Sequence, residues 1–110
     1  MPVLRSSTPH YSIRPGLSRR LAHLDDLMVA VLDFTDGPWD EPEPPHNHPH
    51  EQISYVIEGR ILFYCEGDEP EELHAGDIFV VPSGKSHTIQ LLSGTAQLVD
   101  AFSPIREEFL

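Results

Sequence analysis

Prolines and glycines interrupt this chain so often that no long helix fits between them. Eleven prolines and seven glycines are distributed through 110 residues, and a proline inside a helix removes a hydrogen bond and clashes with the preceding turn. The apolar segments between these residues are short and rich in Val, Ile, Leu and Phe, which favours strands. We predict strands at 28–35, 53–58, 61–66, 78–81, 87–92 and 96–102. Segments of this length and spacing indicate an all-β sandwich or barrel.

The chain length and the continuity of this pattern predict one domain over residues 1–110. Residues 1–9 are expected to form a flexible arm, and residues 18–24 fit either a strand or a short helical turn. Residues 37–45 form an acidic, proline-rich connection. Trp39 in this connection lies either in a plain surface loop or at the mouth of a binding site, because loops at the rim of a scaffold often carry function.

Acidic residues outnumber basic ones by 18 to 7, which gives a net charge of −11. This charge repels phosphate backbones and anionic lipids, so we expect neither nucleic acid nor a membrane as a partner. The single cysteine, Cys65, excludes an intramolecular disulfide, and we expect it to be a small buried hydrophobic residue in a reducing compartment. No apolar run is long enough for a membrane span and no secretory signal is visible, so we predict a cytoplasmic protein.

Three histidines lie close together in the segment Pro-His-Asn-His-Pro-His-Glu-Gln. In an extended strand alternate side chains share a face, so His46 and His48 point the same way and could grip one metal ion. Gln52 could join them, and His87, at the start of a later predicted strand, could add a third imidazole. His50 has the same parity as the first pair, and with seven histidines in the chain a His-x-His pair also arises by chance.

The spacing of these residues resembles the first motif of the cupin superfamily. That motif has a glycine, five residues, His-x-His, three or four residues, a glutamate, six residues and a second glycine. The chain has this spacing with two substitutions, Asp40 for the first glycine and Gln52 for the glutamate. The residues that match the motif are His46, His48 and Gly59.

The second cupin motif is present in full. It requires a glycine, five residues, Pro-x-Gly, two residues and a histidine, and the chain has Gly76, Pro82, Gly84 and His87. The motifs span about residues 40–92, and the resemblance extends over about 25–105. It implies a small single-domain cupin β-barrel, also called a jelly roll or double-stranded β-helix, with one divalent metal ion. The ligands that the resemblance implies are His46, His48, Gln52 and His87, and the family spacing skips His50.

Three neutral imidazoles and a neutral amide would leave the +2 charge of the ion uncancelled, whereas a glutamate ligand would reduce it to +1. Nitrogen and oxygen donors of this kind suit Zn²⁺, Ni²⁺, Fe²⁺, Mn²⁺ or Co²⁺, and affinity alone does not choose among them. Positions left open on the ion could bind the carboxylate and hydroxyl oxygens of a substrate. Such a centre would also supply the positive charge that an anionic substrate needs in an acidic protein.

A carboxylate interrupts the inward apolar row of the last predicted strand. By alternation Asp100 shares a face with Leu98 and Phe102, and burying an unpaired carboxylate is costly. Either Asp100 caps a turn or pairs with Arg106, or it lies beside the metal as a general acid or base. In the second case Arg106 would clamp a substrate carboxylate.

The histidine segment, the run Tyr-Val-Ile-Glu-Gly and residues 102–110 resemble the KdgF family of small cupins in particular. This resemblance implies a metal-dependent, non-redox enzyme that opens the ring of 4,5-unsaturated monouronates, the sugar acids that lyases release from pectin and alginate. Asp100 would transfer the proton, Arg106 would bind the carboxylate and Phe102 would shape the pocket. The resemblance to small cupins also implies a homodimer that forms through sheet edges.

Two other functions stay open at this point. An Fe(II)-dependent cupin dioxygenase is one, because three histidines and a carboxamide could support O₂ binding. A non-catalytic sugar-binding cupin is the other.

Overall fold

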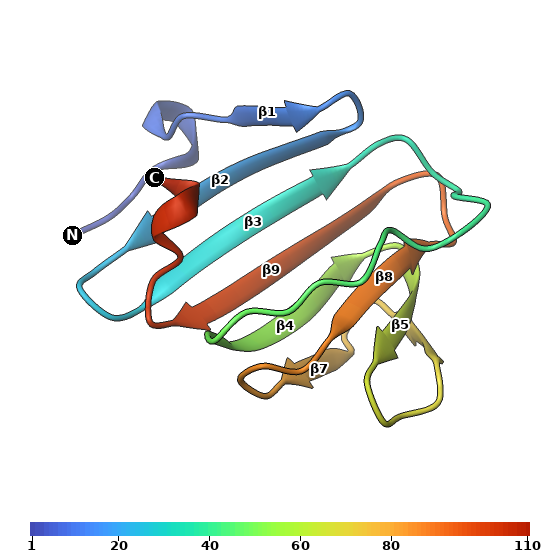
Figure 1. The fold of residues 1–110 in the computed structure, drawn as a ribbon. Helices are drawn as coiled ribbons and strands as arrows, with labels where there is room; N and C mark the ends of the chain where they lie inside the picture. Colours follow the sequence, from blue (N-terminus) through green and yellow to red (C-terminus); the bar gives the residue numbers. More distant parts are fainter.

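The computed structural model describes residues 1–110 as nine strands in two antiparallel sheets, with two short 3₁₀ helices. The larger sheet has the order β1-β2-β3-β9-β4-β7 and the smaller one β6-β5-β8 (Figure 1). The 3₁₀ helices are η1 (Arg5–Ser7) and η2 (Glu107–Phe109). The strands are β1 (Tyr11–Arg14), β2 (Leu17–His23), β3 (Met28–Phe34), β4 (Glu51–Glu58), β5 (Arg60–Cys65), β6 (Glu71–His74), β7 (Ile78–Val81), β8 (His87–Leu91) and β9 (Ala96–Ser103).

The predicted all-β class is confirmed, and each of the six predicted strands is present with bounds that agree to within two residues. The ambiguous segment 18–24 is a strand, β2. The prediction missed two further strands, β1 and β6. Strand β6 pairs only with β5 and carries Glu71 and Glu72. Charged residues are tolerated on an edge strand because one side of it faces water, so β6 lacks the apolar pattern on which the prediction depended.

The core lies between the two sheets and takes side chains from both. Along β9 every second residue is buried from Ala96 to Phe102, as the two-residue period of a strand requires. Fully burying a Leu, Ile or Phe side chain stabilises the fold by about 1.5–3 kcal/mol. The buried residues of the main cluster are Phe34, Val56, Ile61, Phe79, Val81, Leu91, Ala96 and Leu98. A smaller cluster of Met28, Ala30 and Phe102 extends this core toward η2.

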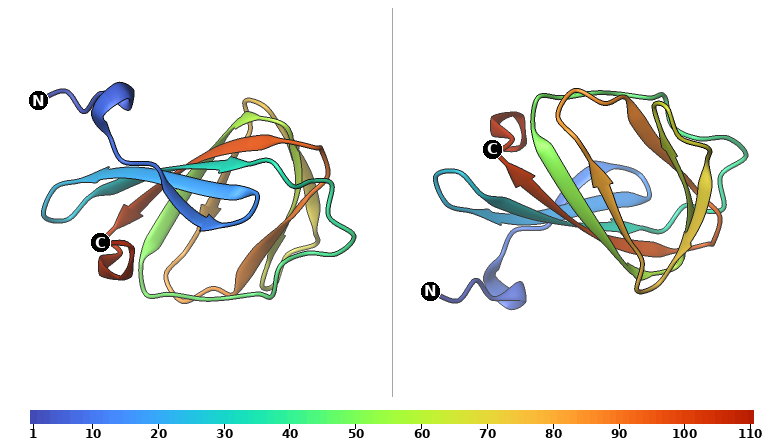
Figure 2. Two further views of the ribbon diagram at one scale, coloured as in Figure 1. Left: turned by 90° about the horizontal axis from the view of Figure 1, so that it is seen from above. Right: turned by 90° about the horizontal axis from the view of Figure 1, so that it is seen from below.

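Seen from above and from below relative to the view of Figure 1, the strands surround a common interior, and the N-terminal segment projects from the body (Figure 2). Residues 1–9 are almost entirely exposed, and their flexibility stays a prediction. Neither 3₁₀ helix is long and apolar enough to cross a membrane. The Gly59 of the first motif has a φ of +91°, and a Cβ there would lie 2.5 Å from the carbonyl oxygen of Thr95. The β4–β5 turn therefore excludes any side chain at this position.

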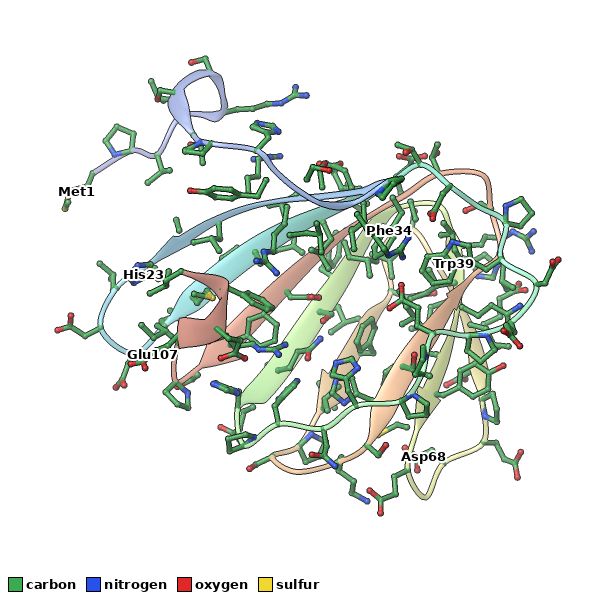
Figure 3. The ribbon with its side chains drawn as sticks, turned by 45° about the horizontal axis from the view of Figure 1, so that its top comes forward. Met1, His23, Phe34, Trp39, Asp68 and Glu107 are labelled. Atoms are coloured by element: carbon green, nitrogen blue, oxygen red, sulfur yellow. The ribbon has the colours of Figure 1, made fainter.

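The acidic connection before the histidine segment runs along β8. Trp39 N donates to Leu91 O and Glu43 N donates to Ile89 O, so the loop continues the smaller sheet. This pairing carries the chain to His46, which forms an antiparallel bridge with His87. The Trp39 ring packs edge-on against Phe34 at 5.6 Å between centroids, far from the C-terminal helix at Glu107 (Figure 3). Trp39 is a packing residue and does not line the cavity described below.

Candidate metal centre

Three histidines from two segments of the chain converge at one end of the interior. His46 and His48 follow the acidic connection, and His87 begins β8. Backbone hydrogen bonds join His46 and His87 in both directions, at 3.1 and 2.9 Å. One ring nitrogen from each histidine lies within 4.8 Å of the other two. The structure therefore brings together all three predicted imidazoles, within reach of a single ion.

Hydrogen bonds to backbone carbonyls fix which nitrogen of two of these rings faces the cluster. His48 Nδ1 donates to His50 O and His87 Nδ1 donates to Lys85 O, both at 2.9 Å. An imidazole that donates through Nδ1 carries its lone pair on Nε2, as is common in metal-binding histidines. His87 Nε2 is buried and has no hydrogen-bond partner in the protein. A buried acceptor without a partner is costly, and a cation would satisfy it.

Gln52 is the second residue of β4, and its amide lies beside the cluster. Its Oε1 is 3.1 Å from His48 Nε2, and its Nε2 donates to Ser54 Oγ at 2.9 Å. Ser54 donates its only proton to Asp100, so it can only accept from Gln52, and the amide oxygen must face the histidines. Gln52 Oε1 and His48 Nε2 are then two acceptors turned toward each other. This donor set fits a divalent ion, which both atoms could coordinate.

The electrostatics of the cluster favour neutral imidazoles. Burial lowers the pKa of all three histidines, and it lowers the pKa of His87 to about 4. The positive charge of Arg106 acts in the same direction on each of them. The rings are therefore unprotonated near pH 7, which is the form that binds a metal.

Asp100 points inward from β9 and is only 7% exposed. Burial raises the pKa of its carboxyl group to about 6, although the hydrogen bond from Ser54 and the charge of Arg106 oppose this shift. The first alternative from the sequence, a turn cap or a pair with Arg106, is wrong. Arg106 Nε instead lies 2.7 Å from Glu108 Oε1, because the chain turns back after β9 and places Glu108 beside it.

A cavity of about 180 Å³ lies beside the histidines. The predicted site residues that line it are His46, Gln52, His87, Asp100, Phe102 and Arg106. His48 completes the nitrogen cluster and packs edge-on against Phe102 at 5.9 Å. His50 stays outside this cluster and contributes the carbonyl that orients His48. Cys65 is buried, as predicted.

The sequence did not identify Arg19, Phe109 or Ser54 as part of this region. Arg19 and Phe109 line the cavity, and Ser54 links Gln52 to Asp100. Asp100 was identified because a charged residue alternates with apolar residues in a predicted strand. Arg19 alternates with Leu17 and Leu21 in the same way. The sequence did not assign residues 18–24 to a strand, however, so it could not assign Arg19 to the inner face.

The fold and this site define the class of protein. The sequence model of the cupin domain matches residues 35–102, and the chain belongs to the cupin family. It is 33% identical to the pectin degradation protein KdgF of Dickeya dadantii over 94% of this chain and 92% of that protein.

Solved structures agree with this family assignment. The structure of KdgF from Halomonas sp. matches with a TM-score of 0.85 and 33% identity, over 97% of each chain. A RmlC-like cupin from Shewanella frigidimarina matches with a TM-score of 0.87 and 32% identity, over 98% of this chain and 94% of that one. The predicted cupin jelly roll and the resemblance to KdgF are therefore confirmed.

Proposed function

We propose that this protein is a metal-dependent enzyme that opens the ring of a 4,5-unsaturated monouronate from pectin or alginate breakdown. Similarity to a pectin degradation protein over 94% of the chain supports a substrate of this class. The observation that carries the proposal is that a buried carboxylate, a guanidinium and the histidine cluster share one cavity. A sugar acid presents the matching groups, which are a carboxylate, ring and hydroxyl oxygens, and a transferable proton.

His46, His48, Gln52 and His87 would hold one divalent ion. When bound, the ion supplies Lewis-acid stabilisation of oxygen atoms that gain negative charge. The ligand set is neutral, so the site keeps a charge of +2 that attracts an anionic sugar into a chain with a net charge of −11. Zn²⁺, Ni²⁺, Fe²⁺, Mn²⁺ and Co²⁺ all suit this set of nitrogen and oxygen donors.

The reaction is an isomerisation in which one proton changes position. The anomeric hydroxyl loses its proton while the C1–O5 bond breaks, which forms the C1 aldehyde and leaves O5 as the oxygen of an enolate. Protonation at C4 then converts the enolate to the C5 ketone, so atoms and charge balance without any oxidant. Asp100 is suited to take the first proton and return it at C4, because a pKa of about 6 lies close to neutral pH.

Two further side chains would position the sugar acid. Arg106 lines the cavity and can donate two parallel hydrogen bonds to the substrate carboxylate. Phe102 is 2% exposed and packs against His48. It would therefore form an apolar wall that positions the sugar ring relative to the histidine cluster. Ser54 would hold Asp100 in place through its hydrogen bond.

The test is the loss of the 4,5-ene absorbance of an unsaturated galacturonate or mannuronate with purified protein loaded separately with each candidate metal. We expect turnover with at least one metal, and about 100-fold or greater loss of kcat in Asp100→Asn. Metal analysis of the protein as purified identifies the resident ion. Absence of turnover with every metal, on a protein shown to retain the ion, would refute the proposal.

The two alternatives give different results in the same experiment. A dioxygenase would require iron and would consume oxygen, whereas ring opening proceeds without oxygen. A sugar-binding cupin would show ligand-dependent thermal stabilisation without turnover. Oxygen uptake and the unfolding temperature are therefore recorded alongside the absorbance.

We also propose that the protein is a homodimer and that a face of the large sheet, rather than a sheet edge, forms the interface. Strand pairing aligns two uncharged apolar rows across β3, β9, β4 and β7. The rows are Val29, Ala101, Ile53 and Val80, and Val31, Val99, Tyr55 and Ile78. Ile53, Ile78 and Val80 are each more than half exposed. A second copy offers the same apolar surface, and two such sheets can pack face to face.

Sedimentation equilibrium tests this interface. Ile53→Glu should convert a dimer to a monomer. Leu24→Glu is the matched control, because Leu24 is 71% exposed outside these strands and should leave the mass unchanged. A wild-type monomer at micromolar concentration, or an Ile53→Glu dimer, would contradict the proposal.

A further inference from the structure

Arg19 of β2 faces the same cavity as Arg106 and forms no ion pair with any carboxylate. Its Nε is buried and has no hydrogen-bond partner. The same is true of Arg20 on the other face of β2, so the cavity that Arg19 faces is what distinguishes the two residues. The contrast with Arg14, which pairs with both Asp36 and Glu43, is informative in a chain with 18 acidic residues. A partly buried guanidinium left without an anion at a cavity wall is energetically unfavourable unless a ligand supplies one.

The two guanidinium groups meet at the ring of Phe109. Arg19 Cζ lies 3.7 Å and Arg106 Cζ lies 4.3 Å from the ring centroid, so both groups are held by stacking on one aromatic side chain. Burial lowers the pKa of Arg19, and the positive charge of Arg106 lowers it further. Glu108 forms an ion pair only with Arg106, although its negative charge also raises the pKa of Arg19. Two guanidinium groups therefore share one paired carboxylate, which leaves this wall of the cavity with a net positive charge.

The directions from which the two side chains arrive suit one shared anion. Arg106 follows β9, whereas Arg19 comes from β2, which is separated from β9 by β3 in the sheet. A carboxylate between them could accept hydrogen bonds from two sides, and guanidinium groups recognise planar carboxylates in this way.

We propose that Arg19 and Arg106 together form the carboxylate-binding site of the cavity. The guanidinium of Arg19, which forms no ion pair within the protein, is the group available to the ligand. The ligand class is a sugar monocarboxylate, and this identity rests on the proposed function, whereas the requirement for an anion does not. Arg19 is a binding and specificity residue. It distinguishes a uronate from the neutral sugar with the same ring.

The test compares two neighbouring arginines that point to opposite faces of β2. Arg20 lines a shallow groove on the outer face, beside Val29 and Val31, so Arg20→Gln makes the same charge change away from the cavity. Binding of D-galacturonate and of D-galactose to the metal-loaded proteins is measured by calorimetry. We expect Arg19→Gln to weaken galacturonate binding about tenfold or more, to leave galactose binding unchanged and to raise KM more than it lowers kcat. Arg20→Gln should match the wild type.

Further variants keep the test valid if Arg19→Gln disturbs the packing of η2. Arg19→Lys retains the charge and should recover part of the affinity. Glu108→Gln removes the one carboxylate that competes for Arg106; Glu108 is half exposed, so the fold should tolerate the change. It should tighten galacturonate binding severalfold, whereas Glu107→Gln, next to it, should not.

The outcomes separate this inference from the proposed function. Arg19-dependent binding of galacturonate without turnover of unsaturated uronates would support the arginine site and refute the proposed activity. Turnover with an unchanged KM in Arg19→Gln would overturn the arginine site alone. Equal losses for galacturonate and galactose, or no saturable binding of any uronate by the wild type, would also overturn it.

Discussion

Ser54 and Asp100 are 46 residues apart in the chain and face each other across the β4–β9 pair, with Ser54 Oγ 2.5 Å from Asp100 Oδ1. Because Ser54 also accepts a hydrogen bond from Gln52, one hydroxyl connects a proposed metal ligand to the proposed proton-transferring carboxylate. The protonation of Asp100 and the orientation of the Gln52 amide are therefore coupled.

Replacing Ser54 by Ala should raise the pKa of Asp100 further above its ordinary range, because the hydrogen bond from Ser54 is a contact that lowers it. The acid limb of the pH–rate profile should move to higher pH. The variant should also lose about 1–3 kcal/mol of stability, since the buried Gln52 amide loses its acceptor. Kinetics from pH 5 to 8 and urea unfolding measure the two effects. An unchanged acid limb would show that Ser54 does not tune Asp100.

Asp100 should make the stability of the metal-free protein depend on pH. Its pKa is about 6 in the folded chain against an ordinary 3.8, so the folded state holds a proton that the unfolded state has released between these values. The stabilisation is fully present below about pH 3.8 and is lost as the pH rises through about 6.

Asp100→Asn removes this titration. The stability of the wild type relative to this variant should fall by up to about 3 kcal/mol between pH 4 and 7, at roughly 1.4 kcal/mol for each pKa unit. Urea unfolding in the presence of a chelator measures it, and the other titrating groups cancel in the comparison. A difference that stays constant with pH would contradict the raised pKa.

His48→Ala should abolish metal retention and leave the sheets intact. The variant removes a ring nitrogen that faces Gln52 Oε1 and two other imidazoles, whereas the main core cluster does not include His48. His50→Ala is the matched control because His50 lies outside the cluster and its backbone carbonyl, which orients His48, is retained, although the variant loses the edge-on contact between the two rings. Metal analysis after gel filtration and far-UV circular dichroism give the result. Metal retained by His48→Ala, or lost equally by both variants, would show that the ligand set is wrong.

Gln52→Glu should weaken the binding of an anionic sugar although it strengthens metal binding. A glutamate ligand reduces the charge of the centre from +2 to +1, and attraction for a carboxylate falls with it. Ser54 would then face two carboxylates with one proton to donate, so one of them should bind an extra proton. Galacturonate affinity, metal affinity and the pH–rate profile are measured together. Uronate binding as tight as in the wild type would argue against a role for the uncancelled charge.

The sequence by itself determined most of the strands of this protein and the positions of its motif residues. Short segments rich in Val, Ile, Leu and Phe predicted six of the nine strands. Motif spacing identified the three histidines that converge and the glutamine beside them. Parity alone placed Asp100 on the inner face of its strand. These features depend on separations of a few residues or on a spacing shared with relatives, so a linear sequence records them.

Other features depended on which strands pair and in what register. Arg106 pairs with Glu108 rather than Asp100 because of the path of the chain after β9. Ser54 contacts both Gln52 and Asp100 because the β4–β9 register places it opposite Asp100. Arg19 lines the cavity because β2 lies two positions from β9 in the sheet and because η2 places the ring of Phe109 against the Arg19 guanidinium. Contacts of this kind join residues far apart in the chain, and their energies depend on burial and orientation that only the packed sheets establish.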